Sequence, residues 1–204
     1  SDVYKRQIHY VEDFRAAAGV AGSDHNPLVA VAHSMGGLVT LSALKELVHP
    51  TVRAVALSNP LLRVTTPPSA GKLLLARVGS RLFPRLPQPN ELSADLISRD
   101  KDVVARYEAD PMVFSTITPR WARTMLKAQD AVFAHAGQYT TPLRMMVGTA
   151  DGVCDHTAAL QLADAWGGPC EKVVYDGLYH ELFNEPEKDT VISELVTWLD
   201  GLSL

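Results

Sequence analysis

The sequence predicts an α/β fold in which helices flank a parallel sheet. Short aliphatic runs without polar alternation recur along the chain, as expected of strands that are covered on both faces. Apolar residues at helical spacing separate these runs, which is the order that a parallel sheet requires. The chain has 204 residues, of which 47% are hydrophobic, enough for one domain with a sizeable core. We therefore expect residues 1–204 to form a single domain.

The predicted elements follow one another in a regular order. Residues 1–7 show no apolar period and are set aside as a leader, whereas apolar residues recur at helical spacing from Ile8 to Ala18. The strand at 28–32 is predicted to be central in the sheet, because its aliphatic run has no polar side. The remaining strands are expected at 52–57, 142–147 and 172–175, and the remaining helices at 38–48, 156–166 and 189–202.

The second and third strands are separated by a segment far longer than an ordinary connection. We expect residues 60–139 to form an inserted helical cap, with helices over 72–83, from about 92, and over 119–134. The first of these helices has an apolar side flanked by two arginines; the residues are Leu74, Leu75, Val78 and Leu82 with Arg77 and Arg81. Two interpretations stay open for it, peripheral contact with an anionic membrane surface or simple packing on the core.

Charge and cysteine content exclude several classes of function. The net charge is −4 and no basic block stands out, so nucleic acid is not an expected partner. Cys154 and Cys170 are too few for a disulfide framework and lack the paired spacing of a zinc site, which favours a reducing, cytoplasmic setting. No apolar run reaches the roughly 18 residues that a spanning helix needs. We expect a small-molecule enzyme or binding protein without a metal.

A motif for a nucleophilic serine lies directly between a predicted strand and a predicted helix. Ala32, Ser34 and Gly36 match the pattern small-x-Ser-x-Gly, in the strand–turn–helix context that this motif requires. The small flanking residues allow a sharp turn, which forces the serine into a strained backbone conformation. Such a turn lifts the hydroxyl to the carboxyl end of the sheet and aims the Met35 N–H at the same point, as half of an oxyanion hole. The alternative is an ordinary helix N-cap serine.

A serine hydroxyl needs a base, and the best candidate is His180. It follows the fourth predicted strand, and therefore lies on the same rim of the sheet as Ser34. His33 adjoins the serine and is a candidate for the pocket wall, but its side chain is expected to point away from Ser34. The other histidines are interpreted as solvated or capping side chains: His9, His25, His49, His135 and His156.

The acid of the site is predicted to be Asp151, which follows the third strand on that same rim. The chain order Ser34, Asp151, His180 is the order of the triad in enzymes with this serine turn. Asp155 and Asp176 are rivals. Asp155 is more readily explained as the cap of the helix that begins at residue 156, and Asp176 as part of the turn before a glycine.

These motifs together resemble the monoacylglycerol lipase and lysophospholipase branch of the α/β-hydrolases, also called serine-aminopeptidase-like hydrolases. The segments that carry the resemblance are 33–37, 57–61, 96–100, 107–111, 148–155 and 175–181. The resemblance implies an α/β-hydrolase fold, with Ser34, Asp151 and His180 as nucleophile, acid and base. It also implies that Met35 donates its N–H to the oxyanion and that the inserted segment caps an acyl-binding channel.

Members of that group carry further strands and an oxyanion loop ahead of the point where this sequence begins. We therefore expect a partial domain, missing the N-terminal strands. The predicted reaction is hydrolysis of a monoacylglycerol or lysophospholipid ester through an acyl-enzyme, without a cofactor, at a rate that rises with pH through neutrality. Three alternatives stay open: a general carboxylesterase, a serine aminopeptidase anchored by Glu91, Asp95 or Glu108, and an inactive fragment. Ser34 excludes a dehalogenase or an epoxide hydrolase, which needs a carboxylate at the turn.

Overall fold

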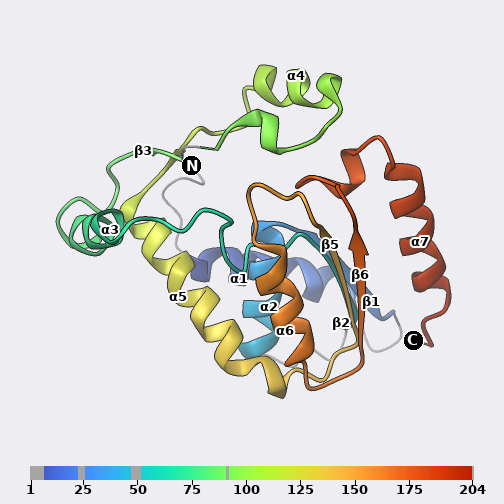
Figure 1. The fold of residues 1–204 in the computed structure, drawn as a ribbon. Coiled ribbons are helices and arrows are strands. Elements are labelled where there is room, and N and C mark those ends of the chain that lie inside the picture. Colours follow the sequence, from blue (N-terminus) through green and yellow to red (C-terminus); the bar gives the residue numbers. More distant parts are fainter. Residues whose placement is uncertain (1–6, 23–25, 47–51, 91, 204) are drawn as a thin grey trace.

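Four parallel strands form the centre of the protein. The computed structural model describes residues 7–22, 26–46, 52–90 and 92–203. The strands lie in the order β1-β2-β5-β6 (Figure 1). Their bounds are Leu28–His33 for β1, Val52–Ser58 for β2, Leu143–Gly148 for β5 and Cys170–Tyr175 for β6. The predicted α/β fold with a parallel sheet is confirmed.

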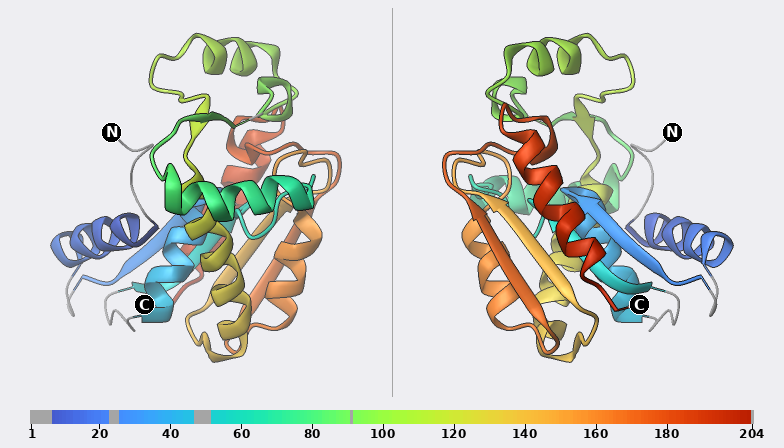
Figure 2. Two further views of the ribbon diagram at one scale, coloured as in Figure 1. Left: turned by 90° about the vertical axis from the view of Figure 1, so that its left-hand side faces the viewer. Right: turned by 90° about the vertical axis from the view of Figure 1, so that its right-hand side faces the viewer.

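Helices cover both faces of this sheet (Figures 1 and 2). One face carries α2 (Met35–Glu46), α5 (Pro119–His135) and α6 (His156–Asp164), and the other carries α7 (Lys188–Asp200). The alternation of strand side chains divides the core, because neighbouring residues of a strand point to opposite faces. In β5, Met145 packs in the cluster beneath α2, α5 and α6, whereas Met146 packs in the cluster beneath α7. α1 (Gln7–Ala21) lies outside this layer, where Val11 packs on α2.

The first strand differs from its prediction. β1 pairs with β2 and with no other strand of the described residues, and Val31 is 48% exposed. The prediction of a central strand covered on both faces is therefore wrong for this sheet. An aliphatic run indicates that a strand is suited to burial, but it does not indicate how many strands pair with it.

The segment between β2 and β5 divides into two parts. Its first part holds α3 (Ala70–Leu82), α4 (Lys101–Ala109) and a short two-stranded sheet, and it lies beyond the end of the main sheet at which β5 and β6 end (Figure 1). The remaining elements of this part are β3 (Gln88–Pro89), η2 (Ala94–Leu96) and β4 (Thr116–Ile117). Its second part, α5, returns to the core, where Val132 is fully buried beside α2, and ends in η3 (Ala136–Gln138).

Some sequence predictions fall on residues that the structure does not describe. These include the leader over 1–6, His25, His49 and Glu91. None of the helices in the described ranges is both long enough and apolar enough to cross a membrane.

Gly148, the last residue of β5, marks the closest approach between the sheet and the loop after β6. A Cβ at this position would stand 2.3 Å from the carbonyl oxygen of Leu178 and 2.9 Å from that of Tyr179. Both atoms belong to the backbone, so they cannot rotate away. A side chain here would have to displace the loop that precedes His180.

We therefore expect Gly148→Ala to lower the free energy of unfolding by roughly 1–3 kcal/mol, the usual cost of overpacking. Urea unfolding measures the change. Gly19→Ala is the matched control, because nothing lies within 4 Å of a Cβ at Gly19 on helix α1. That control is expected to be neutral or stabilising. Equal stability of the two variants would contradict the close approach.

Candidate active site

The backbone of Ser34 has the strained conformation that the sequence predicts. Its φ angle is +51°, in the left-handed region that residues other than glycine rarely adopt. Hydrogen bonds hold the turn, since the Ser34 N–H donates to the Ser58 carbonyl at 3.1 Å and the Ser34 carbonyl accepts from Gly37 and Leu61. Met35 begins α2, so its N–H has no acceptor within the helix. The strand–turn–helix context of the motif is confirmed.

His180 is hydrogen-bonded through both of its ring nitrogens. Nε2 lies 3.0 Å from Oγ of Ser34, and Nδ1 lies 2.8 Å from Oδ2 of Asp151. A carboxylate accepts hydrogen bonds, so the ring proton sits on Nδ1 and the free lone pair of Nε2 faces the serine hydroxyl. Asp151 and His180 are each 4% exposed. The structure thus brings together the three residues that sequence order singled out.

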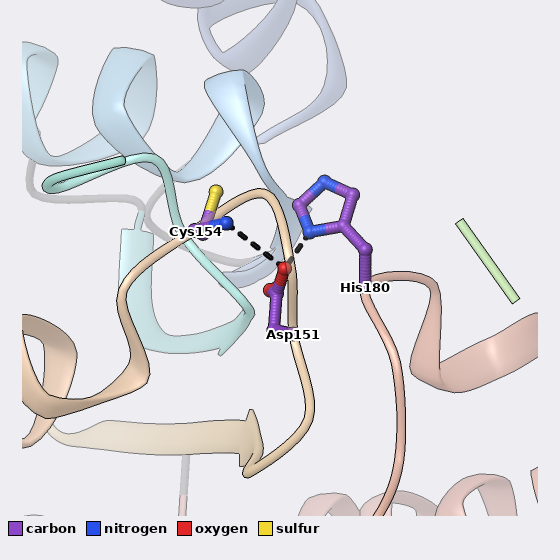
Figure 3. A group of neighbouring side chains, drawn as sticks. All are labelled: Asp151, Cys154 and His180. Atoms are coloured by element: carbon purple, nitrogen blue, oxygen red, sulfur yellow. Dashed lines mark hydrogen bonds and ion pairs between the residues drawn. The ribbon is translucent and has the colours of Figure 1, made fainter. Parts of the chain in front are cut away.

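Hydrogen bonds fix Asp151 as well as the His180 imidazole that it contacts. Its Oδ1 atom accepts the N–H groups of Val153 at 2.7 Å and Cys154 at 2.9 Å, which leaves Oδ2 for His180 (Figure 3). The hydroxyl of Thr65, from the inserted segment, donates to the Asp151 carbonyl at 3.0 Å. The bonds from Val153, Cys154 and His180 satisfy the buried carboxylate, which would otherwise be costly, and the bond from Thr65 fixes the backbone of the same residue.

Cys154 lies against the same group. Burial raises the pKa of its thiol well above the ordinary value, the charge of Asp151 adds to this effect, and a hydrogen bond with Ser34 offsets only part of it. The thiol is therefore neutral and does not compete with the serine as nucleophile. Its 1% exposure and its place in the core are those of a small apolar side chain that fills space.

Within the described part of the chain, Asp151, Cys154 and His180 form a group of possible metal ligands. Their ligand atoms lie within 4.8 Å of one another. The carboxylate and the imidazole already bind each other, and the imidazole also binds Ser34. This bonding pattern is that of a proton-transfer chain.

His33, a sequence candidate for the pocket wall, packs against the ring of His180, a contact that the sequence did not predict. Its ring centroid lies 4.6 Å from that of His180, and its Nδ1 lies 3.0 Å from the Ser58 carbonyl. Burial, and after it the neighbouring His180, lower the pKa of His33 to about 4. His33 is therefore neutral near pH 7 and packs against the ring of His180. Its place next to Ser34 was the available signal, but rotamers are decided by packing.

Asn59 is a second residue that the sequence did not reveal. It follows β2, has a φ angle of +41°, and is 1% exposed. Its side-chain N–H groups donate to the carbonyls of Tyr179 at 3.0 Å and His180 at 2.7 Å, while its oxygen accepts the N–H of Gly148. One amide side chain thus ties the ends of two strands to the loop that carries His180. Its signal in the sequence was an asparagine at a strand end, where a left-handed turn is tolerated.

The rival aspartates have the local roles that the sequence predicts. Asp155 caps α6 by accepting the N–H groups of Thr157 and Ala158. Asp176 accepts a hydrogen bond from Thr149 at the turn that contains Gly177, whose φ angle is +73°. Of the rival histidines, His9 is exposed on α1. His135, at the end of α5, is half-buried and packs edge-on against Tyr139, so its prediction as a solvated side chain is wrong. His156 begins α6, but the N-cap of that helix is Asp155, so the capping role predicted for His156 is also wrong.

A serine on a strained turn, a histidine and a buried carboxylate, all at the carboxyl end of a parallel sheet, define an α/β-hydrolase. The family model described as serine aminopeptidase, S33, matches residues 4–187. The chain therefore belongs to this family.

Individual relatives agree with this assignment. The chain is 34% identical to a monoacylglycerol lipase of Mycolicibacterium smegmatis over 93% of its own length and 69% of the relative. It is 27% identical to the phospholipase YtpA of Bacillus subtilis, over 94% of the chain and 74% of the relative. The crystal structure of the Paleococcus ferrophilus monoacylglycerol lipase has the same fold, with a TM-score of 0.88 at 24% identity, covering 96% of this chain and 76% of that one.

Protonation of His33 should weaken the fold in mild acid. Because its pKa is about 4 in the folded protein and about 6.5 when unfolded, the unfolded chain takes up a proton in that interval that the folded protein does not. The contribution of a neutral His33 to the free energy of unfolding is fully present above pH 6.5 and is lost as the pH falls toward 4. Between these values the wild type should lose more unfolding free energy than His33→Asn, by at most roughly 3 kcal/mol.

Urea unfolding of both proteins at several pH values measures this difference. Asparagine keeps a donor for the Ser58 carbonyl, so His33→Asn is the conservative replacement. Parallel stability curves for the two proteins would show that burial does not hold His33 neutral.

Proposed function

We propose that the protein hydrolyses carboxylic esters of lipids through an acyl-enzyme formed on Ser34. One observation carries this proposal: the imidazole of His180 bridges the Ser34 hydroxyl and the Asp151 carboxylate, with 3.0 Å and 2.8 Å between the bonded atoms. This geometry supports the proposed roles of Ser34 as nucleophile, His180 as base and Asp151 as the orienting acid.

In the proposed reaction, Nε2 of His180 takes the proton of the Ser34 hydroxyl while Oγ attacks the ester carbonyl carbon. The carbonyl electron pair moves to oxygen, and the Met35 N–H donates to this oxyanion at the positive end of α2. The intermediate expels the alcohol, which takes the proton from His180. Water then attacks the acyl-serine through the same steps and releases the acid.

The lipid substrate is proposed from the relatives, which carry the names monoacylglycerol lipase and phospholipase. We propose that the part of segment 60–139 that holds α3 and α4 caps the acyl-binding region, as its place beyond the sheet end at which β5 and β6 end suggests (Figure 2). A monoacylglycerol or a lysophospholipid would present a single acyl chain to this region. A general carboxylesterase of shorter esters is the nearest alternative.

Cleavage of peptides from an N-terminus is a second candidate because of the family's description. That activity needs a carboxylate that binds the substrate amine. Of the candidates from the sequence, Asp95 lies 3.4 Å from the ammonium of Lys101 and Glu108 is exposed on α4. Glu91, the third candidate, lies outside the described residues. We propose the ester as substrate because of the names that the relatives carry.

A fluorophosphonate probe tests the nucleophile directly. The wild type should be labelled, and Ser34→Ala should lose both labelling and hydrolysis of a monoacylglycerol. Asp151→Asn should lower kcat by roughly 10⁴-fold, because an amide favours the wrong ring tautomer. Ser193→Ala, an exposed serine on α7, is the matched control and should be labelled like the wild type.

Failure of the wild type to react with the probe would exclude an activated Ser34 and favour the inactive fragment. Hydrolysis of peptides in preference to esters would instead favour the aminopeptidase. Comparing a monoacylglycerol, a lysophospholipid and a short-chain ester of equal concentration separates the substrate classes.

The exposed apolar side of α3 supports a proposed contact with a lipid surface. Leu74, Leu82 and Phe83 are 61%, 66% and 62% exposed, whereas the placement of the Leu75 side chain is not described. Such side chains gain free energy when a lipid interface covers them.

Leu74→Ser combined with Leu82→Ser should reduce binding to phosphatidylglycerol vesicles at least threefold, while hydrolysis of a soluble short-chain ester stays unchanged. Vesicle sedimentation measures binding. Val196→Ser removes a comparably exposed residue on the opposite layer, in α7, and should leave binding unaltered. Equal binding of all variants would favour a purely structural role of this side.

A further inference from the structure

Glu185 is a fully buried carboxylate that the proposed reaction does not use. It follows the short helix η4 (Leu182–Asn184) and has 0% of its surface exposed. A buried charge of this kind is costly unless several donors satisfy it, so its partners indicate what it holds together.

Three of its hydrogen bonds come from the inserted segment. Oε1 accepts the hydroxyl of Ser98 at 2.8 Å and the N–H of Arg99 at 2.6 Å, and Oε2 accepts the Arg99 guanidinium Nε–H at 2.7 Å. The same guanidinium also donates to Glu187. Arg99 thus binds the carboxylate through both its backbone and its side chain, just before α4 begins.

The fourth hydrogen bond of the Glu185 carboxylate comes from the loop that carries His180, the proposed base. Oε2 of Glu185 accepts the N–H of Tyr179 at 3.0 Å, one residue before His180. On the other side of His180, the Glu181 N–H donates to the carbonyl of Ile97 at 2.8 Å. The backbone is therefore fixed immediately before and immediately after the imidazole, in both cases by contacts that involve residues 97–99 or their partner Glu185.

The charge state of Glu185 fits these contacts. Burial alone would raise the pKa of its carboxyl, but the hydrogen bonds from Arg99, Tyr179 and Ser98 outweigh burial and hold the pKa below the ordinary value. The side chain is therefore an anion, which accepts hydrogen bonds only. A neutral amide at this position would turn one of its two ends into a donor facing other donors.

We propose that Glu185 and Arg99 are positioning residues that align His180 with Ser34 by fastening the loop 179–185 to residues 97–99 of the inserted segment. This inference rests on the proposed function of Ser34 and His180. It also gives the inserted segment a role beyond contact with substrate, since residues 97–99 set the place of the proposed base.

The expected size of the effect follows from the geometry of proton transfer. His180 Nε2 stands 3.0 Å from the serine oxygen, and a misplacement of about 1 Å in such a site costs about 10²-fold in rate. The hydrogen bonds of Glu185 join groups of the protein that the proposed reaction does not use. A loss of alignment should therefore lower kcat and leave KM nearly unchanged.

The main test is Glu185→Gln, which keeps the shape of the side chain and removes its charge. We expect kcat for a monoacylglycerol to fall 10- to 100-fold with KM within twofold of the wild type, and fluorophosphonate labelling to slow by a similar factor. Asp164→Asn is the matched control, because it removes the charge of an exposed ion pair with Lys172 and should leave both rates unchanged.

A second variant tests the same inference if Glu185→Gln fails to fold. The Arg99 side chain is 35% exposed, so Arg99→Lys should be tolerated. Lysine keeps a cation but cannot bind Glu185 and Glu187 in the same fork, and kcat should fall by a smaller factor than in Glu185→Gln.

A spectroscopic readout separates positioning from stability and does not need turnover. The Nδ1 proton of His180, bonded to Asp151, gives a low-field proton resonance that is assigned by its loss in His180→Gln. In both Glu185→Gln and Arg99→Lys this proton should exchange with water at least tenfold faster than in the wild type. The Asp164→Asn spectrum should match the wild type.

Unchanged kcat and unchanged proton exchange in variants that merely unfold more easily would overturn the inference, because Glu185 would then only stabilise the fold. Failure of the proposed function is a different result. In that case the wild type itself does not react with the fluorophosphonate, and the exchange of the His180 proton alone decides whether Glu185 positions the ring.

Discussion

The imidazole of His180 is held by one hydrogen bond on each ring nitrogen, and the rest of the site depends on keeping both bonds at once. A ring bonded through one nitrogen can still rotate, whereas a ring bonded through both has a defined tautomer and a defined direction for its lone pair. The two partners, Ser34 and Asp151, follow different strands. The carboxyl ends of parallel strands share one edge of the sheet, and this edge places the three loops within reach of one another.

Buried polar groups fix the positions of the loops at that edge of the sheet. Asn59 binds two carbonyls of the His180 loop and the N–H of Gly148, while the backbone of Gly148 allows the loop to approach closely. Each of these groups would be costly if it lost its partner, so the network favours one arrangement over its neighbours. Burial likewise explains why His33 is neutral where it packs against His180, since removal from water penalises the charged form of its ring more than the Ser58 carbonyl stabilises it.

The inserted segment contributes to the core as well as to the end of the sheet where the site lies. α5 packs beside α2, and Thr65 and residues 97–99 contact the loops of Asp151 and His180. Stability and site geometry are therefore shared between the sheet and the segment that interrupts it. A protein of this design cannot lose the insertion without losing part of the support of its proposed acid and base.

Local patterns in the sequence determined the order of strands and helices, the strained turn at Ser34 and the candidate residues Asp151 and His180, because each of these is encoded within a few neighbouring residues. Caps such as Asp155 were predictable for the same reason. Tertiary structure alone decided that β1 has one neighbouring strand, that His33 turns toward His180, and that Asn59 and Glu185 fasten the His180 loop. These features join residues far apart along the chain, and burial and hydrogen-bond partners come into existence only when the chain has packed.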